Sequence, residues 1–236
     1  MSDRSSHDSH ERFDPAVEPM LQIKQTSFDH MHLRPGQRAL DVGCGTGSDT
    51  LALARIVGSD GLVHGVDYDA AMIAKARQLA DSESMATRVA FHHANAAALP
   101  WPDGYFHASR SDRVLQHMLE PARAFDELLR VTRSGGRVVV ISGDWATQSV
   151  DLEEPDIESR RAHFLATLTA KNDVSGGCLY ALFMQRGLLD LHTEMRRVVG
   201  TGSDANQSWQ RSTTPEAIAS GLFASANVIM ISGRKA

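Results

Sequence analysis

A glycine-rich loop between an apolar strand and a helix restricts most strongly how this chain can fold. Glycines occupy alternate positions from Gly43 to Gly47, after the strand pattern Arg38–Val42 and before the helical pattern Ser48–Val57. Glycine adopts positive φ and lets the backbone approach a ligand closely. The start of the following helix adds unpaired N–H groups and a partial positive charge. This order predicts a strand–loop–helix unit that binds an anionic group at the edge of a sheet.

The alternation of strand and helix patterns continues along the chain. We expect further strands at 62–66, 88–92, 105–109 and 137–141, helices at 70–80 and 121–131, and two late strands at 191–199 and 227–232. Asp69 is expected to cap the helix that follows it. Strands that alternate with helices indicate an α/β fold, with a mostly parallel sheet covered on both faces.

The length of 236 residues suits one α/β domain with an additional segment. We expect a disordered polar tail at 1–13 and a single domain at 14–236, which begins with a cap helix at 14–33. His7 and His10 in the tail are interpreted as exposed side chains, and no metal site is expected.

The segment 145–187 is the least regular part of the pattern. Its two helical stretches carry no strand between them, and they follow the fifth strand at the carboxyl edge, where open α/β sheets bind their ligands. We therefore interpret it as a helical lid over the substrate, lined by Trp145, Phe164 and Phe183. The alternative is that these helices only cap the sheet.

Composition argues against several classes of partner. The formal net charge is −5 and no block of Lys and Arg stands out, so nucleic acid is not an expected partner. No apolar run reaches the length of a membrane span, and the first residues lack the apolar core of a signal sequence. The two scattered cysteines, Cys44 and Cys178, need no disulfide. We expect a cytoplasmic monomer or homodimer that acts on a small molecule.

Two acidic residues distinguish between the ligands that such a loop can bind. Asp67 ends the second strand, where a carboxylate can accept hydrogen bonds from a ribose diol. Asp41 lies just before the glycines, where it would repel a pyrophosphate but suits an ammonium group. The dinucleotide pattern also requires glycine where Ser48 stands. S-adenosylmethionine, with an amino acid at one end and a nucleoside at the other, satisfies both carboxylates better than NAD does.

Several stretches resemble the class I methyltransferases, and in particular the group of ubiquinone and menaquinone biosynthesis methyltransferases. The resemblance rests on residues 40–47, 65–67, 94–96, 99–107, 111–117 and 129–137, and the last strand also fits. It implies a Rossmann-like, doubly wound sheet of about seven strands, closed by a late antiparallel strand. The loop and the resemblance together predict these cofactor-binding residues: Asp41, Gly43, Cys44, Gly45, Gly47, Asp67, Tyr68, Asn95, Ala96 and Arg110.

Two positions depart from the family pattern. Asn95 replaces the usual Asp that accepts a hydrogen bond from the adenine amino group, although an amide oxygen also accepts. His107 stands where Asp is usual, and we interpret this histidine as structural. The resemblance assigns Cys44 a packing role and not that of a nucleophile.

Methyl transfer from a sulfonium is an in-line displacement, so the protein mainly aligns the acceptor and excludes water. An acceptor that must lose a proton also needs a base, and His117 and His163 are the candidates. For both, the alternative is a packed helix residue. The sequence thus predicts an S-adenosylmethionine-dependent methyltransferase acting on an O, N or C nucleophile. A methyltransferase-like protein without methyl transfer, as a binding partner or a rearrangement catalyst, is the alternative, and an NAD-dependent oxidoreductase is disfavoured.

Overall fold

The computed structural model describes residues 17–150, 176–201 and 223–236. The expected tail at 1–13 and the helical stretch at 156–172 lie outside these residues. So do the candidate base His163 and the expected pocket residue Phe164. Trp145 is described only as part of the backbone of a strand.

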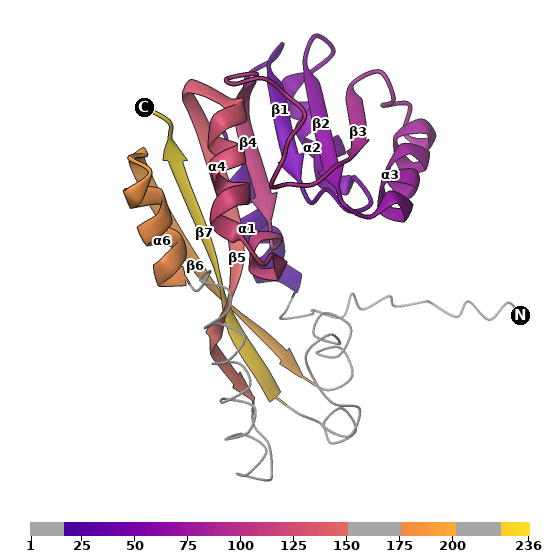
Figure 1. Ribbon diagram of the computed structural model, residues 1–236. Coiled ribbons are helices and arrows are strands. Elements are labelled where there is room, and N and C mark those ends of the chain that lie inside the picture. The colour runs from indigo at the N-terminus through magenta and orange to yellow at the C-terminus, as the bar shows by residue number, and fades with distance from the viewer. Residues whose placement is uncertain (1–16, 151–175, 202–222) are drawn as a thin grey trace, which may run out of the picture.

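The described residues form one sheet with the strand order β3-β2-β1-β4-β5-β7-β6 (Figure 1). Its strands are β1 (Arg38–Val42), β2 (Leu62–Asp67), β3 (Val89–His93), β4 (Phe106–Asp112), β5 (Thr132–Val150), β6 (Leu189–Thr201) and β7 (Phe223–Arg234). β1 to β5 are parallel, whereas β7 is antiparallel to both neighbours. This confirms the predicted seven-stranded, mostly parallel sheet with a late antiparallel strand. The strand order reverses between β1 and β4, which is where such sheets bind ligands.

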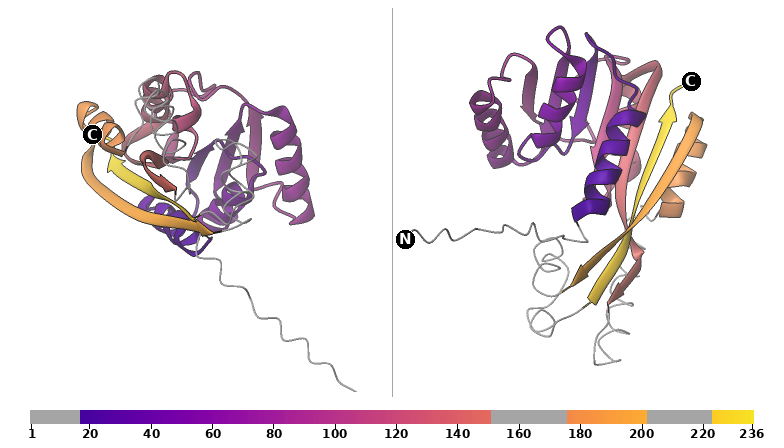
Figure 2. Two further views of the ribbon diagram at one scale, coloured as in Figure 1. Left: turned by 90° about the horizontal axis from the view of Figure 1, so that it is seen from below. Right: turned by 180° about the vertical axis from the view of Figure 1, so that it is seen from behind.

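Helices cover both faces of the sheet. They are α1 (Val17–His30), α2 (Ser48–Val57), α3 (Ala70–Ser82), the 3₁₀ turn η1 (Leu115–His117), α4 (Pro121–Val131) and α6 (Gly176–Gln185). α1, α2 and α3 lie on one face, and α4 and α6 lie on the other (Figures 1 and 2). No helix among the described residues is long and apolar enough to cross a membrane.

Local sequence signals fix several helix ends. The Asp69 carboxylate accepts a hydrogen bond from the Ala71 N–H at 2.7 Å, so the predicted N-cap of α3 is confirmed. Pro121 occupies the first turn of α4, where its missing N–H costs no hydrogen bond. α2 ends at Gly58, which has a φ of 70°.

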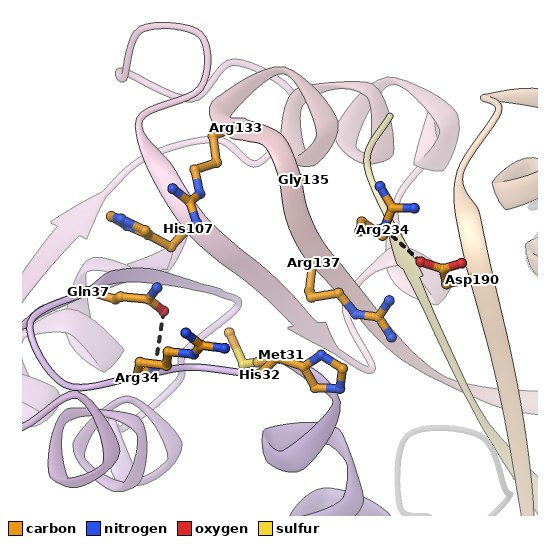
Figure 3. A pocket seen from close by; sticks show the side chains of 10 residues that line it. All are labelled: Met31, His32, Arg34, Gln37, His107, Arg133, Gly135, Arg137, Asp190 and Arg234. Carbon is orange, nitrogen blue, oxygen red and sulfur yellow. Dashed lines mark hydrogen bonds and ion pairs between the residues drawn. The ribbon is translucent and has the colours of Figure 1, made fainter.

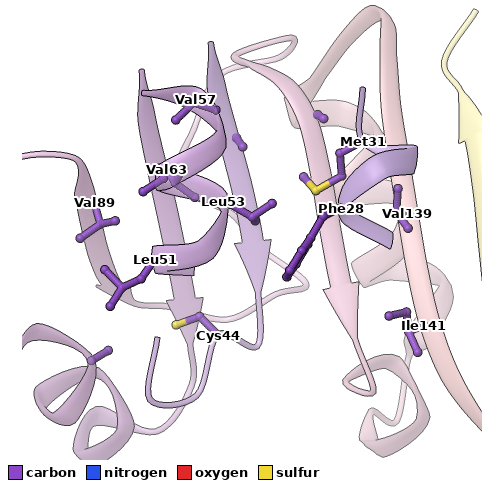
Figure 4. Packing of buried hydrophobic residues seen from close by; sticks show 14 of the residues in the cluster. Phe28, Met31, Cys44, Leu51, Leu53, Val57, Val63, Val89, Val139 and Ile141 are labelled. Atoms are coloured by element: carbon purple, nitrogen blue, oxygen red, sulfur yellow. The ribbon is translucent and has the colours of Figure 1, made fainter. Parts of the chain in front are cut away.

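The sheet separates two apolar cores because successive strand residues point to opposite faces. In β5, Val139 and Ile141 pack beneath α1, as Figure 4 shows, whereas Val138 and Val140 face α4 and α6. Burial on both faces explains the continuous apolar run in this strand.

α6 corrects part of the lid interpretation. Leu179 and Phe183 are fully buried in the core on the α4 face, and the ring centroid of Phe183 lies 4.7 Å from that of Phe125 in α4. Phe183 therefore packs in the core on this face of the sheet, and its place in an acceptor pocket stays a prediction. The backbone of residues 145–150, also assigned to the lid, instead continues β5, where it pairs with β7.

Candidate functional site

The glycine loop lies at the carboxyl end of β1, beside β4. Gly43, Gly45 and Gly47 have φ values of 76°, 53° and 87°, so all three adopt the positive-φ conformations that favour glycine. A Cβ on Gly43 would lie 1.9 Å from Val114 Cγ2, which makes glycine obligatory there. A Cβ on Gly45 would meet nothing within 4 Å. The loop therefore has a packed side at Gly43 and an open side at Gly45, where a ligand can approach the backbone.

Asp67 connects this loop to the end of β2. One carboxylate oxygen accepts a hydrogen bond from the Gly45 N–H at 2.9 Å, and the other accepts from the Asp69 N–H at 2.9 Å. The side chain is half-buried. Each carboxylate oxygen can accept two hydrogen bonds. Asp67 therefore orders the loop and keeps acceptor capacity for the hydroxyl groups of a ligand.

Residues expected to surround the adenine follow β2 and β3 at the same edge. Asp67 and His93 are register partners, so Tyr68 and Asn95 leave neighbouring strands side by side. Tyr68 is 79% exposed, and His93 Nε2 lies 2.8 Å from its carbonyl oxygen. The Asn95 amide oxygen accepts from the Ala97 N–H at 2.9 Å, which orients the Asn95 side chain. An exposed aromatic ring beside an ordered amide suits a planar base.

An ion cluster lies beneath the loop and not on its open side. Asp41 and Arg110 are register partners on β1 and β4, and both point to the face covered by α1 and α2. Their side chains are 2% and 0% exposed. Arg110 Nη1 donates to Asp41 at 3.1 Å, and the Thr50 hydroxyl of α2 donates to the other Asp41 oxygen at 2.8 Å. Each Asp41 oxygen thus has a partner inside the protein.

The Arg110 guanidinium also binds two further carboxylates and a hydroxyl. Its nitrogens lie 3.1 Å from Asp49 of α2 and 2.9 Å from Asp112 of β4, and its Nε donates to Ser27 of α1 at 2.9 Å. Lys24 pairs with Asp49 at 3.0 Å, and Arg113 with Asp112 at 2.9 Å. Three cations thus balance three carboxylates, as buried charge requires.

Burial and pairing act in opposite directions on these carboxyl groups. Burial raises the pKa of Asp41, although Arg110 opposes the shift. Burial would also raise the pKa of Asp112, but Arg110 and Arg113 outweigh it and hold this pKa below the usual value. Arg110 thus favours the charged form of both carboxyl groups, although burial prevails at Asp41.

The positions of two side chains differ from what the sequence suggested. Asp41 was expected to meet the ammonium group of the ligand directly, but its carboxylate is buried and already bound by Arg110 and Thr50. Arg110 was expected to line the methionine end of the site, but its guanidinium is buried beneath α1, 4.9 Å from the Phe28 ring centroid. Both side chains support the loop from below.

Cys44 points into the core under the loop. Its side chain is 8% exposed, and burial raises the pKa of the thiol far above its usual value. A thiol that stays protonated is a poor nucleophile. The structure agrees with the packing role inferred from the resemblance, and the Cys44 N–H joins the loop to β2 through the Val66 carbonyl at 2.9 Å.

His117 lies at the end of η1, which follows β4 at the same edge of the sheet, and its side chain is exposed. The neighbouring Gln116 fixes η1 to β5, since its amide oxygen accepts from the Gly143 N–H at 2.6 Å. His117 is thus held at the edge that carries the glycine loop. Among the described residues, no group of His, Cys, Asp and Glu is arranged to hold a metal ion.

Sequence reasoning missed the partners of the ion cluster: Ser27, Lys24, Asp49, Thr50 and Asp112. One signal was available. Asp41 stands in, and Arg110 directly follows, a strand of a sheet expected to be covered on both faces, where charged residues occur mainly in pairs. Because the two strands were expected to be parallel and in one sheet, Asp41 and Arg110 could have been predicted to form a pair. No comparable pattern in the sequence indicated that α1 contributes side chains to the ion cluster.

Comparison with known proteins places the chain in a family. Residues 33–207 match the family described as the methyltransferase domain, and the chain belongs to that family. It is a class I, S-adenosylmethionine-dependent methyltransferase domain.

Sequence relatives support the same family. An uncharacterized 37.1 kDa protein in a transposon of Streptomyces fradiae is 36% identical over 166 residues, which cover 70% of this chain and 47% of that protein. The ubiquinone/menaquinone biosynthesis C-methyltransferase UbiE of Photorhabdus laumondii is 35% identical over 118 residues, which cover 50% of this chain and 47% of the relative. The chain thus spans about half the length of the curated relatives it matches.

Solved structures share the fold at low identity. The YcgJ protein of Bacillus subtilis superposes with a TM-score of 0.68 at 17% identity, over 92% of this chain and 99% of that one. Geranyl diphosphate C-methyltransferase of Streptomyces coelicolor superposes with a TM-score of 0.64 at 19% identity, over 92% of this chain and 78% of that one. A [4+2]-cyclase, SpnF, superposes with a TM-score of 0.60 at 20% identity, over 91% of this chain and 80% of that one.

Proposed function

We propose that this chain transfers a methyl group from S-adenosylmethionine to a small-molecule acceptor. The observation that supports it most is the open side of the glycine loop at Gly45, which Asp67 ties to the end of β2. When bound, S-adenosylmethionine supplies an activated methyl group on a sulfonium. The residues of the chain then have to hold and orient two ligands and to keep water away from them.

The expected cofactor-binding residues would contact different parts of the cofactor, according to their position along the carboxyl edge of the sheet. The backbone from Gly43 to Gly47, including the Cys44 peptide, would face the methionine portion, and Asp67 would accept hydrogen bonds from the ribose hydroxyls. Tyr68, Asn95 and Ala96 would surround the adenine. Asp41 and Arg110 act as positioning residues, because their ion pair joins β1 to β4 directly beneath the loop.

His117 is the candidate base on the described part of the edge. Its exposure and its place after β4 leave it accessible to an acceptor. His163 remains a second candidate from the sequence, and Trp145 and Phe164 remain candidate acceptor contacts. Relatives named as acting on geranyl diphosphate, on sarcosine and dimethylglycine, and in ubiquinone biosynthesis leave the acceptor class broad, with O, N and C nucleophiles all open.

Calorimetry with S-adenosylmethionine, S-adenosylhomocysteine and NAD tests the cofactor assignment. We expect binding of both adenosyl ligands and none of NAD. Incubation with methyl-labelled cofactor and a panel of phenols, quinols, amines and carboxylates then tests transfer. Tight NAD binding without a response to either adenosyl ligand would overturn the proposal.

A second candidate is a cofactor-binding protein that rearranges its substrate without methylating it. The fold likeness to a [4+2]-cyclase favours keeping this alternative. The same assay separates the two functions, because a rearrangement catalyst would bind the cofactor but leave every label on it. A substrate consumed without label transfer would identify this second activity.

A further inference from the structure

A basic pocket lies at the opposite edge of the sheet from the glycine loop. Its volume is about 470 Å³, and six of its lining residues are histidine or arginine: His32, Arg34, His107, Arg133, Arg137 and Arg234. Figure 3 shows the Arg34 and Arg137 side chains beside the central space, with Arg133 and His107 on one flank. Asp190 is the single carboxylate that lines the pocket among the described residues.

The topology explains why these residues meet. His32 and Arg34 lie in the turn between α1 and β1, and His107 lies near the start of β4. Arg133 and Arg137 belong to the first residues of β5, whereas Arg234 ends β7, which runs the other way. β1 separates this edge from the glycine loop by its five residues, or roughly 16 Å of strand. The pocket is therefore distinct from the cofactor edge.

The charges in this pocket are not balanced within the described part of the chain. Asp190 pairs with Arg234 at 2.6 Å. In the described ranges, no carboxylate lies within ion-pair distance of Arg34, Arg133 or Arg137. An excess of three guanidinium groups is thus directed at one cavity.

Arg137 is the most informative of the three. It is only 9% exposed, and its Nε donates to the His30 carbonyl at 3.3 Å. A buried guanidinium is normally accompanied by carboxylates, as Arg110 is in this same protein. Arg137 instead lines an open cavity, where an external anion can supply the missing charge.

The two histidines that line the pocket, His32 and His107, lie in the same positively charged surroundings. Burial and then Arg137 and Arg34 lower the pKa of His32. Burial, Arg133 and Arg38 lower the pKa of His107, whose Nδ1 accepts from the Arg38 N–H at 3.2 Å. Neutral imidazoles among guanidinium groups still offer ring N–H donors to an anion.

We propose that this pocket binds a small molecule that carries two or more linked phosphate groups. The planar guanidinium fork matches phosphate oxygens in a bidentate manner, and several forks on one cavity favour several phosphates. A volume of about 470 Å³ lies within the usual range of small-molecule sites and exceeds what one phosphate fills. Free pyrophosphate and the phosphate chain of a nucleotide share this chemistry.

Calorimetry on the full chain tests the site with pyrophosphate and ATP, and with orthophosphate as the singly phosphorylated comparison. We expect pyrophosphate or ATP to bind more tightly than orthophosphate. ATP binding tighter than that of pyrophosphate would identify a nucleotide as the source. The R34A/R133A variant removes two exposed side chains that form no hydrogen bond with the described residues, and should weaken binding about tenfold or more.

The matched control is R55A/R186A, which removes the same charge from exposed arginines on α2 and just after α6. It should leave the affinity for pyrophosphate unchanged, and both variants should bind S-adenosylhomocysteine like the unmodified chain. R137Q should abolish the increase in melting temperature that pyrophosphate produces. Absence of binding by the unmodified chain, or an equal loss in both double variants, would overturn the proposal.

Discussion

At the scale of single residues, Arg110 connects more of the molecule than any residue of the glycine loop. One buried guanidinium binds carboxylates from β1, β4 and α2 and a hydroxyl from α1. Loss of one partner from such a cluster leaves buried charge without compensation, which costs more than the intact cluster contributes. The register of β1 and β4, and with it the position of the loop, therefore depends on this side chain.

Arg110→Met should lower the free energy of unfolding by about 3–5 kcal/mol, because Asp41 and Asp112 lose their buried cation. Urea denaturation monitored by circular dichroism measures the loss. Arg55→Met is the control, since Arg55 forms an exposed pair with Glu83 and such pairs contribute about 0–1 kcal/mol. Equal losses in the two variants would show that the buried cluster has no special role.

Asp67→Ala should weaken S-adenosylhomocysteine binding more than Asn95→Ala does. Asp67 would lose a charged contact, whose hydrogen bonds contribute roughly 1.5–3 kcal/mol, whereas Asn95 would lose a neutral bond of about 1 kcal/mol. Asp67→Ala also removes the acceptor for the Gly45 N–H, which adds to the loss. Calorimetry on both variants gives the comparison, and equal affinities would exclude Asp67 from the ribose contact.

The sequence predicted the residues of the site better than their roles. Glycine spacing located the loop, and the end of β2 located Asp67, because both follow from local pattern. The orientation of Asp41 depends on what the neighbouring strand places opposite it, and the sequence had not paired it with Arg110. A carboxylate before a glycine loop thus suggested a ligand contact where the structure has an internal ion pair.

At the scale of elements, α6 belongs to the core of the sheet. Phe183→Ala should reduce the free energy of unfolding by about 3–5 kcal/mol, because it removes a fully buried ring packed on Phe125. The neighbouring Met184 is 55% exposed, so Met184→Ala should change stability by less than about 0.5 kcal/mol. Denaturation curves test both. A Phe183→Ala variant of unchanged stability but altered acceptor turnover would restore the lid interpretation.

Element boundaries were predictable where a residue with a special backbone conformation stood at the end. β1, α2 and α4 have the predicted bounds, since glycines or a proline border them. β5 was expected at 137–141 but runs through Thr132–Val150, because Thr132 at its start pairs with Phe106 of β4, and its last residues pair with β7, which lies far away in the sequence. Long-range antiparallel pairing leaves no mark in the local pattern.

At the scale of the whole molecule, the parallel sheet places two unlike sites at its two ends. The carboxyl ends of the strands carry the glycine loop, Asp67 and His117, and the opposite end carries the basic pocket. The sequence located the first end, because loops after parallel strands bind ligands by a general rule. It did not locate the second, because the pocket residues come from one turn and four strands that run in both directions, and they meet only in the folded chain.

Histidines make the stability of the whole molecule depend on pH. Burial and neighbouring cations lower the pKa of five of them: His30, His32, His64, His92 and His107. A histidine whose pKa is lower in the folded chain binds fewer protons there than in the unfolded chain. Its contribution to stability is present above pH 6.5 and is lost as the pH falls toward the folded value.

His64 should dominate this dependence. Burial and the neighbouring His92, whose Nε2 lies 3.0 Å from His64 Nδ1, lower the pKa of His64 to about 4. Between pH 7 and pH 5 this shift should remove about 1–2 kcal/mol from the free energy of unfolding. Asp112, with its lowered pKa, contributes only below about pH 4, whereas Asp41, whose pKa burial raises, offsets part of the loss as the pH falls. Urea denaturation at pH 7 and pH 5 should therefore show a smaller difference for His64→Gln than for the unmodified chain. An identical difference in both proteins would place the main proton-linked group elsewhere.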